Sequence, residues 1–213
     1  VKDASAGSRI IVEASASGQD ADIQFLTADD GQGWVTFHNG TDNKGAIKYN
    51  HASDYMAFRT NGTDDQIKID SAGHVTMPRQ PAFLVNAATQ SNISVNAAVT
   101  VTFSSEVFDQ NADFNTSTYT FTAPVTGRYL LTANVRADSV PTDATYFRVY
   151  IVTSNRNIMG RIFDPDGYDS TPVYDYYSAS ALVDMDASDT AYVAVYQYEG
   201  TSQADIQADS LFS

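Results

Sequence analysis

The chain has 213 residues, 43% of them hydrophobic, which is enough for one large or two small domains with a buried core. It contains no cysteine, and this excludes disulfide scaffolds, cysteine nucleophiles and cysteine-ligated zinc. The formal net charge of −14 disfavours binding to nucleic acid or to an anionic membrane surface, and no apolar run is long enough for membrane insertion.

The acidic residues are almost all aspartate. Of the 26, only Glu13, Glu106 and Glu199 are glutamate. Aspartate favours caps and turns because its short side chain bonds nearby backbone groups, whereas glutamate favours helices. Thirteen tyrosines and eleven phenylalanines suit the pleated surface of strands. The composition therefore predicts an all-β fold of many short strands joined by tight turns.

The first part of the chain is expected to hold an extended lead-in and a thin sheet. Residues 1–20 are small and polar and are predicted to be the lead-in. Since the chain begins with valine, we expect it to be a piece of a longer protein. Within residues 21–77, six runs alternate apolar and polar residues, which predicts strands at 21–27, 34–38, 46–50, 55–60, 66–70 and 74–77.

Each predicted strand places its apolar residues on one face. The pairs are Ile23 and Phe25, Val35 and Phe37, Ile47 and Tyr49, Met56 and Phe58, Ile67 and Ile69, and Val75 and Met77. A thin sheet with one apolar face makes a poor core alone. We therefore expect an intertwined β-stalk made of three chains, with a small β-domain packed on the second half as the alternative.

The segment from Gly45 to Met77 resembles one that is common in bacteriophage tail fibres and related virion fibre proteins. The shared phrases are I-x-Y-x-H-x-x-D, F-x-T-N-G and I-D-S-x-G-x-V, which begin here at Ile47, Phe58 and Ile69. The resemblance covers about a sixth of the chain and implies a fibre stalk. Two prolines then interrupt the pattern, so residues 78–82 are the expected linker between the stalk and a second domain.

The second part has longer strands with a clear alternation. In residues 127–135, Tyr129 and Leu131 share one face with Ala133 and Val135, while the other face is polar except for Leu130. Tyr119 and Phe121 likewise share a face. The two runs are joined by the turn residues P-V-T-G at 124–127, which predicts neighbouring strands of a β-sandwich.

The spacing of six residues then resembles a known family signature: Phe103, Asp109, Phe114, Phe121, Gly127 and Tyr129. The signature is that of the complement component 1q globular-head family, which is related to the tumour-necrosis-factor fold. The resemblance implies a ten-stranded jelly-roll knob over residues 83–213, with Gly127 in a tight turn and Tyr129 plugging the sandwich. Two further aromatic positions of the signature are Leu131 and Ala133 here, so the core there is expected to be smaller or filled from elsewhere.

Three other segments resemble the same family. Pro81–Asn86 is similar to its first strand, Ala181–Gly200 to its late hairpin with Asp189 at the turn, and Asp209–Ser213 to the start of its last strand. The family usually continues beyond that point, so the last strand is expected to be truncated or completed differently. Domains of this family assemble as trimers, which implies a trimeric knob on a trimeric stalk.

Candidate site residues cluster in one acidic, tyrosine-rich stretch. Asp164, Asp166 and Asp169 are oxygen donors for calcium or, alternatively, solvated turn residues. No firm cofactor is expected beyond that candidate. A receptor-binding surface is expected from aromatic and cationic residues near the same loop, with core packing as the alternative for each tyrosine. These residues are Tyr168, Tyr174, Tyr176, Tyr177, Arg156 and Arg161.

The sequence predicts no enzyme. It has no G-x-S-x-G elbow and no phosphate loop. His38, His51 and His74 each lie beside an expected turn without metal-ligand spacing, although on a threefold axis one histidine would supply three ligands. Aspartates are numerous, so a glycosidase carboxylate pair remains open.

The expected function is a homotrimeric fibre tip on the outside of a virion. It would be a phage tail receptor-binding protein that attaches to a bacterial surface glycan or outer-membrane protein and joins other fibre or baseplate proteins. The alternatives are a secreted adhesin or lectin with the same knob, a capsule depolymerase, and an architectural fibre whose knob drives trimerisation.

Overall fold

The computed structural model describes residues 12–14, 17–18, 20–62 and 64–213, so most of the predicted lead-in lies outside the described residues. The chain divides into two compact units, Val1–Pro78 and Arg79–Ser213. Apart from one turn of 3₁₀ helix, η1 (Pro165–Gly167), the regular structure of the described residues is β-strand, as the composition predicted.

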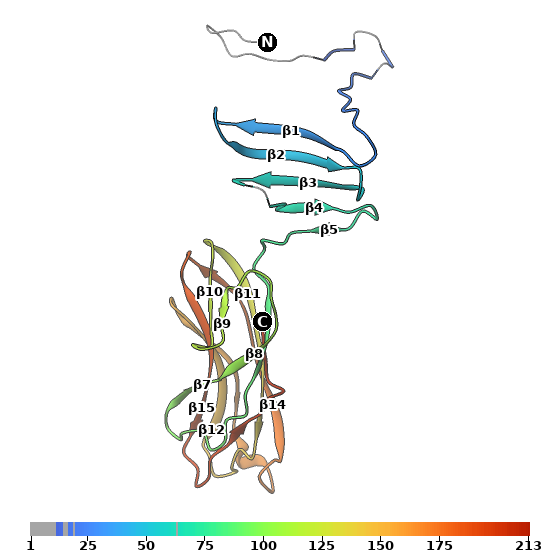
Figure 1. Ribbon diagram of the computed structural model, residues 1–213. Helices are drawn as coiled ribbons and strands as arrows, with labels where there is room; N and C mark the ends of the chain where they lie inside the picture. Colours follow the sequence, from blue (N-terminus) through green and yellow to red (C-terminus); the bar gives the residue numbers. More distant parts are fainter. Residues whose placement is uncertain (1–11, 15–16, 19, 63) are drawn as a thin grey trace. The chain divides into compact units, whose positions relative to one another are not determined.

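The first unit contains one antiparallel sheet whose five strands follow chain order (Figure 1). The strands are β1 (Gln32–His38), β2 (Asn43–Asn50), β3 (Tyr55–Thr60), β4 (Ile67–Ile69) and β5 (Val75–Thr76). The turn between β3 and β4 needs left-handed backbone at Asn61 and Gly62, whose φ angles are 48° and 145°. Asparagine and glycine adopt such angles most readily, which explains the N-G pair at that turn.

The register aligns the apolar residues on one face of this sheet. Val35 pairs with Ile47, Ile47 with Phe58, and Phe58 with Ile67. Although the face is continuous, it stays open: Val35 is 41% exposed and Phe37 is 57% exposed. The predicted one-sided sheet is therefore present in a single chain, with its apolar face uncovered.

The opposite face of the same sheet is polar and internally satisfied. The Lys48 side chain is 1% exposed, and its Nζ donates to Tyr55 Oη at 2.6 Å and to Asp65 Oδ2 at 3.0 Å. Arg59 pairs with the same carboxylate, and both cations lie over the Trp34 ring. Burial raises the pKa of Asp65, but the hydrogen bonds from Arg59 and Lys48 outweigh it and hold that pKa below its usual value.

The strand predicted at residues 21–27 is wrong. This stretch has no strand pairing, and Ile23 and Phe25 are 64% and 50% exposed. Phe25 instead lies above β1, since a Cβ atom at Gly33 would come within 3.2 Å of its Cβ. Alternation alone does not make a strand; a neighbouring strand must also accept its hydrogen bonds.

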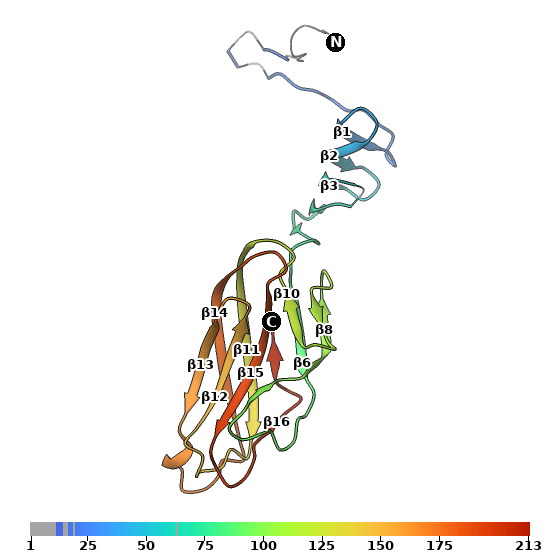
Figure 2. The ribbon, with the colours of Figure 1, turned by 90° about the vertical axis from the view of Figure 1, so that its left-hand side faces the viewer.

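The second unit is a sandwich of two sheets whose strands run side by side (Figure 2). One sheet has the order β13-β12-β15-β10-β9 with β7 beside β15, and the other has the order β14-β11-β17-β6-β8 with β16 beside β11. The ten strands of these two paths form the jelly-roll-like fold that the sequence predicted. The bounds are β6 (Phe83–Ala87), β7 (Ala98–Thr100), β8 (Phe103–Asp109), β9 (Phe114–Asn115), β10 (Thr120–Thr122), β11 (Gly127–Asp138), β12 (Tyr146–Thr153), β13 (Asn157–Phe163), β14 (Tyr174–Met185), β15 (Thr190–Tyr198), β16 (Asp205–Ile206) and β17 (Leu211–Phe212).

Aromatic rings from the four strands β6, β9, β10 and β17 pack at one end of the core. Phe83 stacks on Phe114 and Phe121 with centroids 5.1 and 5.0 Å away, and Phe212 meets Phe83 edge to face. Ala133, where the family signature has an aromatic residue, pairs directly with Phe212 of β17. The large side chain on the neighbouring strand thus occupies the space that the small one leaves, as the sequence reading allowed.

Three local predictions for this unit are wrong. The 124–127 turn joins β10 to β11, which lie in different sheets. The link between β14 and β15 also crosses from one sheet to the other, so Ala181–Gly200 is not a hydrogen-bonded hairpin. Tyr119 has a left-handed φ of 60° and precedes β10 instead of alternating along it. Gly127 begins β11 with ordinary strand backbone, so it is not needed for a tight turn.

Candidate functional site

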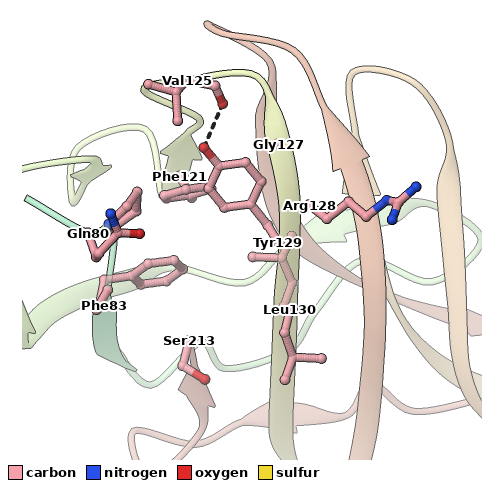
Figure 3. A pocket seen from close by; sticks show the side chains of 12 residues that line it. Gln80, Phe83, Phe121, Val125, Gly127, Arg128, Tyr129, Leu130 and Ser213 are labelled. Atoms are coloured by element: carbon pink, nitrogen blue, oxygen red, sulfur yellow. Dashed lines mark hydrogen bonds between the residues drawn. The ribbon is translucent and has the colours of Figure 1, made fainter. Parts of the chain in front are cut away.

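The signature residues hold the sandwich together. Both carboxylate oxygens of Asp109, at the end of β8, accept backbone N–H groups, from Asp113 at 3.2 Å and Phe114 at 2.8 Å. The Tyr129 ring leans on Phe121 at 5.4 Å, and its hydroxyl donates to the Val125 carbonyl at 2.6 Å (Figure 3). These residues therefore close a loop and one end of the core, which is a structural role.

A hollow of about 490 Å³ lies beside Tyr129. Figure 3 shows Phe83 and Phe121 next to the tyrosine ring, and Arg128 extending away from it. The lining consists of Gln80, Pro81, Ala82, Phe83, Phe121, Val125, Gly127, Arg128, Tyr129, Leu130, Leu131 and Ser213. Since it has no Asp, Glu or His, this hollow offers no carboxylate pair for glycoside hydrolysis.

The four tyrosines of the expected receptor-binding surface are separated by the fold. Tyr177 is fully buried in the core, packed on Phe147 with a centroid distance of 4.7 Å, and burial raises its pKa. Tyr168 is 45% exposed and meets Phe163 edge to face beside η1. Tyr174 and Tyr176 point outward from β14 and are 61% and 39% exposed. Only the last two share a surface.

That surface carries a charged network from the two strands β11 and β14 and from the loop before β17. Tyr176 Oη donates to Asp209 Oδ2 at 2.6 Å, and this hydrogen bond raises the pKa of Tyr176 and lowers that of Asp209. Arg136 of β11 pairs with Asp138 at 2.8 Å and with Asp209 at 3.1 Å, and its guanidinium lies over the Tyr174 ring. One cation thus lies between two carboxylates, so Arg136 is fully paired and the network keeps a net negative charge.

The two arginines expected to contact an acidic glycan are both engaged within the chain. Arg156 pairs with Asp184 at 2.9 Å. Arg161 pairs with Asp175 at 3.0 Å and donates to the Tyr176 carbonyl at 3.0 Å. The two lie near opposite ends of β14, so the fold does not bring them together as one site.

The aspartates considered for calcium act locally. Asp164 is the N-cap of η1, and its carboxylate accepts the Asp166 N–H at 3.2 Å. Across the residues that the structure describes, no group of three or more His, Cys, Asp or Glu side chains is placed to hold a metal ion. Asp164, Asp166 and Asp169 therefore do not converge, and the geometry fits their reading as a turn.

The outer face of β11 and β14 also exposes an apolar pair that the sequence reading missed in part. Leu130 and Leu182 are direct cross-strand partners, and each is 67% exposed. The sequence indicates Leu130 as an exception in its strand, but it predicts no surface that joins Leu130 to Leu182 or Arg136 to Asp138 and Asp209. Leu182 interrupts the polar side of its own strand in the same way, and this break in the alternation is the sequence signal that could have indicated the exposed pair.

Comparison with known families decides the identity of the second unit. Residues 82–213, more than half of the chain, match the C1q domain model. The chain belongs to the C1q domain family. C1q domains are trimerising knobs without enzymatic activity, and proteins that carry them are typically extracellular. Among the residues that the structure describes, no helix is long and apolar enough to cross a membrane.

Two solved structures are similar to the C1q domain of this chain. The globular domain of the zebrafish complement 1qA protein is 19% identical, with a TM-score of 0.44, and the match covers 62% of this chain and 94% of that one. Murine APRIL is 12% identical, with a TM-score of 0.42, over 61% of this chain and 95% of that one. No curated protein gives a significant match.

Proposed function

We propose that this protein is the homotrimeric tip of a virion fibre, most simply a phage tail fibre, whose C1q knob attaches to a glycan or outer-membrane protein on a bacterial surface. The observation that carries the proposal is that each unit leaves apolar side chains uncovered on a sheet: a whole face in the first unit, and the Leu130–Leu182 pair in the knob. Threefold self-association would cover both faces and would also align three copies of any binding site, so that weak contacts add up through avidity.

In the knob, the face that supports self-association is the outer side of β11 and β14. The paired Leu130 and Leu182 expose most of their surface at one end of the β11–β14 ladder, and the Arg136 network lies towards the other end. A solvent-facing sheet is normally polar on that side. Protein interfaces usually combine an apolar core with a polar rim, and the leucine pair and the Arg136 network would supply these two parts.

In the first unit, the corresponding face is the apolar side of the β1–β5 sheet. Phe37 of β1 and Met56 and Phe58 of β3 are each at least 38% exposed there, although both strands flank β2 in one continuous surface. The polar side cannot supply the missing core, because Lys48 and Asp65 already satisfy each other. Copies of the same face would supply it.

The fibre setting is supported by the resemblance of Gly45–Met77 to phage fibre segments. A secreted adhesin with the same knob has no comparable support from the first unit. The location on a virion and the bacterial partner are proposed on the strength of that resemblance.

The test measures attachment of the whole chain to cells. We expect the fluorescently labelled protein to bind a subset of a panel of bacterial strains saturably. The double variant Leu130→Asp, Leu182→Asp should lose association of the knobs and bind at least tenfold more weakly because avidity falls. Val173→Asp, at another highly exposed position in residues 79–213 (73%), is the control and should behave as the unchanged protein.

A trimer that binds no strain would favour the architectural fibre, and release of oligosaccharide from capsule would favour a depolymerase.

A further inference from the structure

The outward side of β12 and β15 carries aromatic side chains where a solvent-facing sheet usually has polar ones. Phe147 and Val195 on these strands are fully buried in the core, so the residues next to them point outward. The outward residues include two direct cross-strand pairs, Tyr146 with Tyr198 and Arg148 with Tyr196. With the neighbouring Tyr150, they form what we call the tyrosine–arginine cluster: Tyr146, Arg148, Tyr150, Tyr196 and Tyr198.

The rings of the cluster hold the arginine in place. Tyr146 is nearly parallel to Tyr198, with centroids 5.2 Å apart and an interplanar angle of 21°. The guanidinium carbon of Arg148 lies 5.5 Å from the Tyr146 centroid, 5.2 Å from that of Tyr150 and 4.9 Å from that of Tyr196. Three ring faces around one cation fix its position by cation–π attraction.

Arg148 nevertheless has no anionic partner. Within the described part of the chain it makes no ion pair, and its Nε is buried without a hydrogen-bond partner. Carboxylates are nevertheless in excess, since residues 79–213 contain fifteen acidic residues against six arginines and no lysine. Arg136, Arg156 and Arg161 all have a carboxylate partner. A buried donor without an acceptor calls for an explanation.

We propose that the tyrosine–arginine cluster binds a saccharide that carries one carboxylate, with the carboxylate on the terminal nitrogens of Arg148 and the sugar rings against Tyr146, Tyr196 and Tyr198. Tyr150 is only 5% exposed and packs against the arginine. A guanidinium recognises a carboxylate in bidentate fashion. Tyrosine presents an apolar ring to sugar C–H groups and a hydroxyl to their oxygens. Since the arginine is already held between rings, binding loses little of its side-chain freedom.

The charge of the protein limits the ligand further. A densely charged polyanion would be repelled by a chain with a net charge of −14. One arginine instead suits a saccharide with isolated carboxylates. Glu199, the acidic residue that directly follows β15, is already engaged within the chain, because its carboxylate accepts a hydrogen bond from Thr145 Oγ1 at 2.6 Å.

The cluster remains accessible in the proposed trimer, because it lies on the sheet that does not contain Leu130 and Leu182. The proposal names the ligand class of the attachment function and rests on that function for its biological setting. Binding of the isolated saccharide, however, can be measured without any cell.

The experiment is calorimetric titration of the full chain with a trisaccharide that ends in one glucuronic acid, and with its methyl ester, which keeps the ring and removes the charge. We expect the acid to bind and the ester to bind roughly tenfold or more weakly. Arg148→Met should lose binding of the acid by a similar factor, while Arg128→Met, at an exposed arginine outside the cluster, should bind unchanged. Tyr196→Leu is a second variant and should weaken the acid and the ester together.

Equal binding by Arg148→Met, equal affinity for acid and ester, or no binding at millimolar concentration would each overturn the proposal. Light scattering and thermal unfolding of every variant separate these results from misfolding. If the trimer and cell attachment persist while the acid does not bind, only the ligand assignment fails; if the chain is monomeric and attaches to no cell, the proposed function fails as well.

Discussion

Gly160 marks the place where the edges of the two knob sheets meet. A Cβ atom there would lie 2.5 Å from the Ala179 Cβ of β14 and 2.6 Å from the Ser178 carbonyl oxygen. Its φ is not in the left-handed region, so what the position requires is space. Backbone atoms cannot move aside as a flexible side chain can, and the closeness of β13 to β14 therefore depends on this one missing methyl group.

We predict that Gly160→Ala destabilises the knob by about 1–3 kcal/mol, because overpacking forces the two strands apart. Gly167→Ala is the matched control, since nothing lies within 4 Å of its Cβ position and its φ is also ordinary. Thermal unfolding followed by circular dichroism compares them. Equal midpoints for the two variants would show that the sheets do not approach each other at Gly160.

A second residue-scale prediction concerns pH and Asp65. Because its folded-state pKa lies below the ordinary value of 3.8, Asp65 contributes stability that is present above that value and is lost as the pH falls through the folded pKa. The first unit should therefore weaken below about pH 4. Trp34, the only tryptophan, lies beside Lys48 and Arg59, so its fluorescence during denaturant unfolding reports on this unit alone.

Asp65→Asn should cost roughly 3 kcal/mol at neutral pH, since it leaves the buried Lys48 ammonium without its carboxylate. Asp42→Asn, which breaks an exposed pair with Lys44, should change the stability by less than about 0.5 kcal/mol. Both are compared at one protein concentration, because association stabilises the folded form. Similar losses for the two variants would mean that Lys48 is solvated.

At the scale of elements, the short strand β17 links the two parts of its sheet. It pairs with β6 on one side and with β11 on the other, and it delivers Phe212 to the aromatic end of the core. We predict that Phe212→Ala costs about 3–5 kcal/mol, whereas Leu211→Ala, partly exposed on the other face, costs less than half of that. Urea unfolding of the two variants measures the difference, and equal losses would contradict the packing described here.

Local pattern predicted strands well and their partners poorly. The run 55–60 was predicted to the residue, because Tyr55–Thr60 alternates and ends at an N-G turn. Ala181–Gly200 was assigned to a hairpin, yet its two strands belong to different sheets. Alternation reports which face of a strand is buried, and a sandwich buries faces of both sheets, so sequence alone does not say which sheet a strand joins.

The candidate site illustrates the same limit. Tyr174, Tyr176 and Tyr177 are adjacent in sequence, but only alternation along β14 decides that Tyr177 enters the core and the other two face outward. Arg156 and Arg161 were predicted to contact a receptor because they lie near a loop. The fold instead gives each of them a carboxylate partner from β14. Arg148 has none, and that difference depends on three-dimensional neighbours, which the sequence does not reveal.

At the scale of the whole molecule, we propose that the chains associate through their own side chains and not through a bound metal. Since no group of three or more metal-ligating side chains is assembled among the described residues, we predict that a calcium chelator changes neither the solution mass nor the unfolding temperature. Light scattering and calorimetry with and without EDTA check this. A mass that falls on chelation would restore calcium as part of the assembly and would direct attention back to Asp164, Asp166 and Asp169.

The most direct test of the central claim is the mass of the unchanged chain in solution, measured by light scattering beside the Leu130→Asp, Leu182→Asp variant. We predict three times the chain mass of 23.1 kDa for the unchanged chain, and a lower average mass for the variant at the same concentration. A folded, stable monomer of the unchanged chain would contradict the proposed trimer, because the apolar face of the first unit and the Leu130–Leu182 pair would then be shown to need no partner.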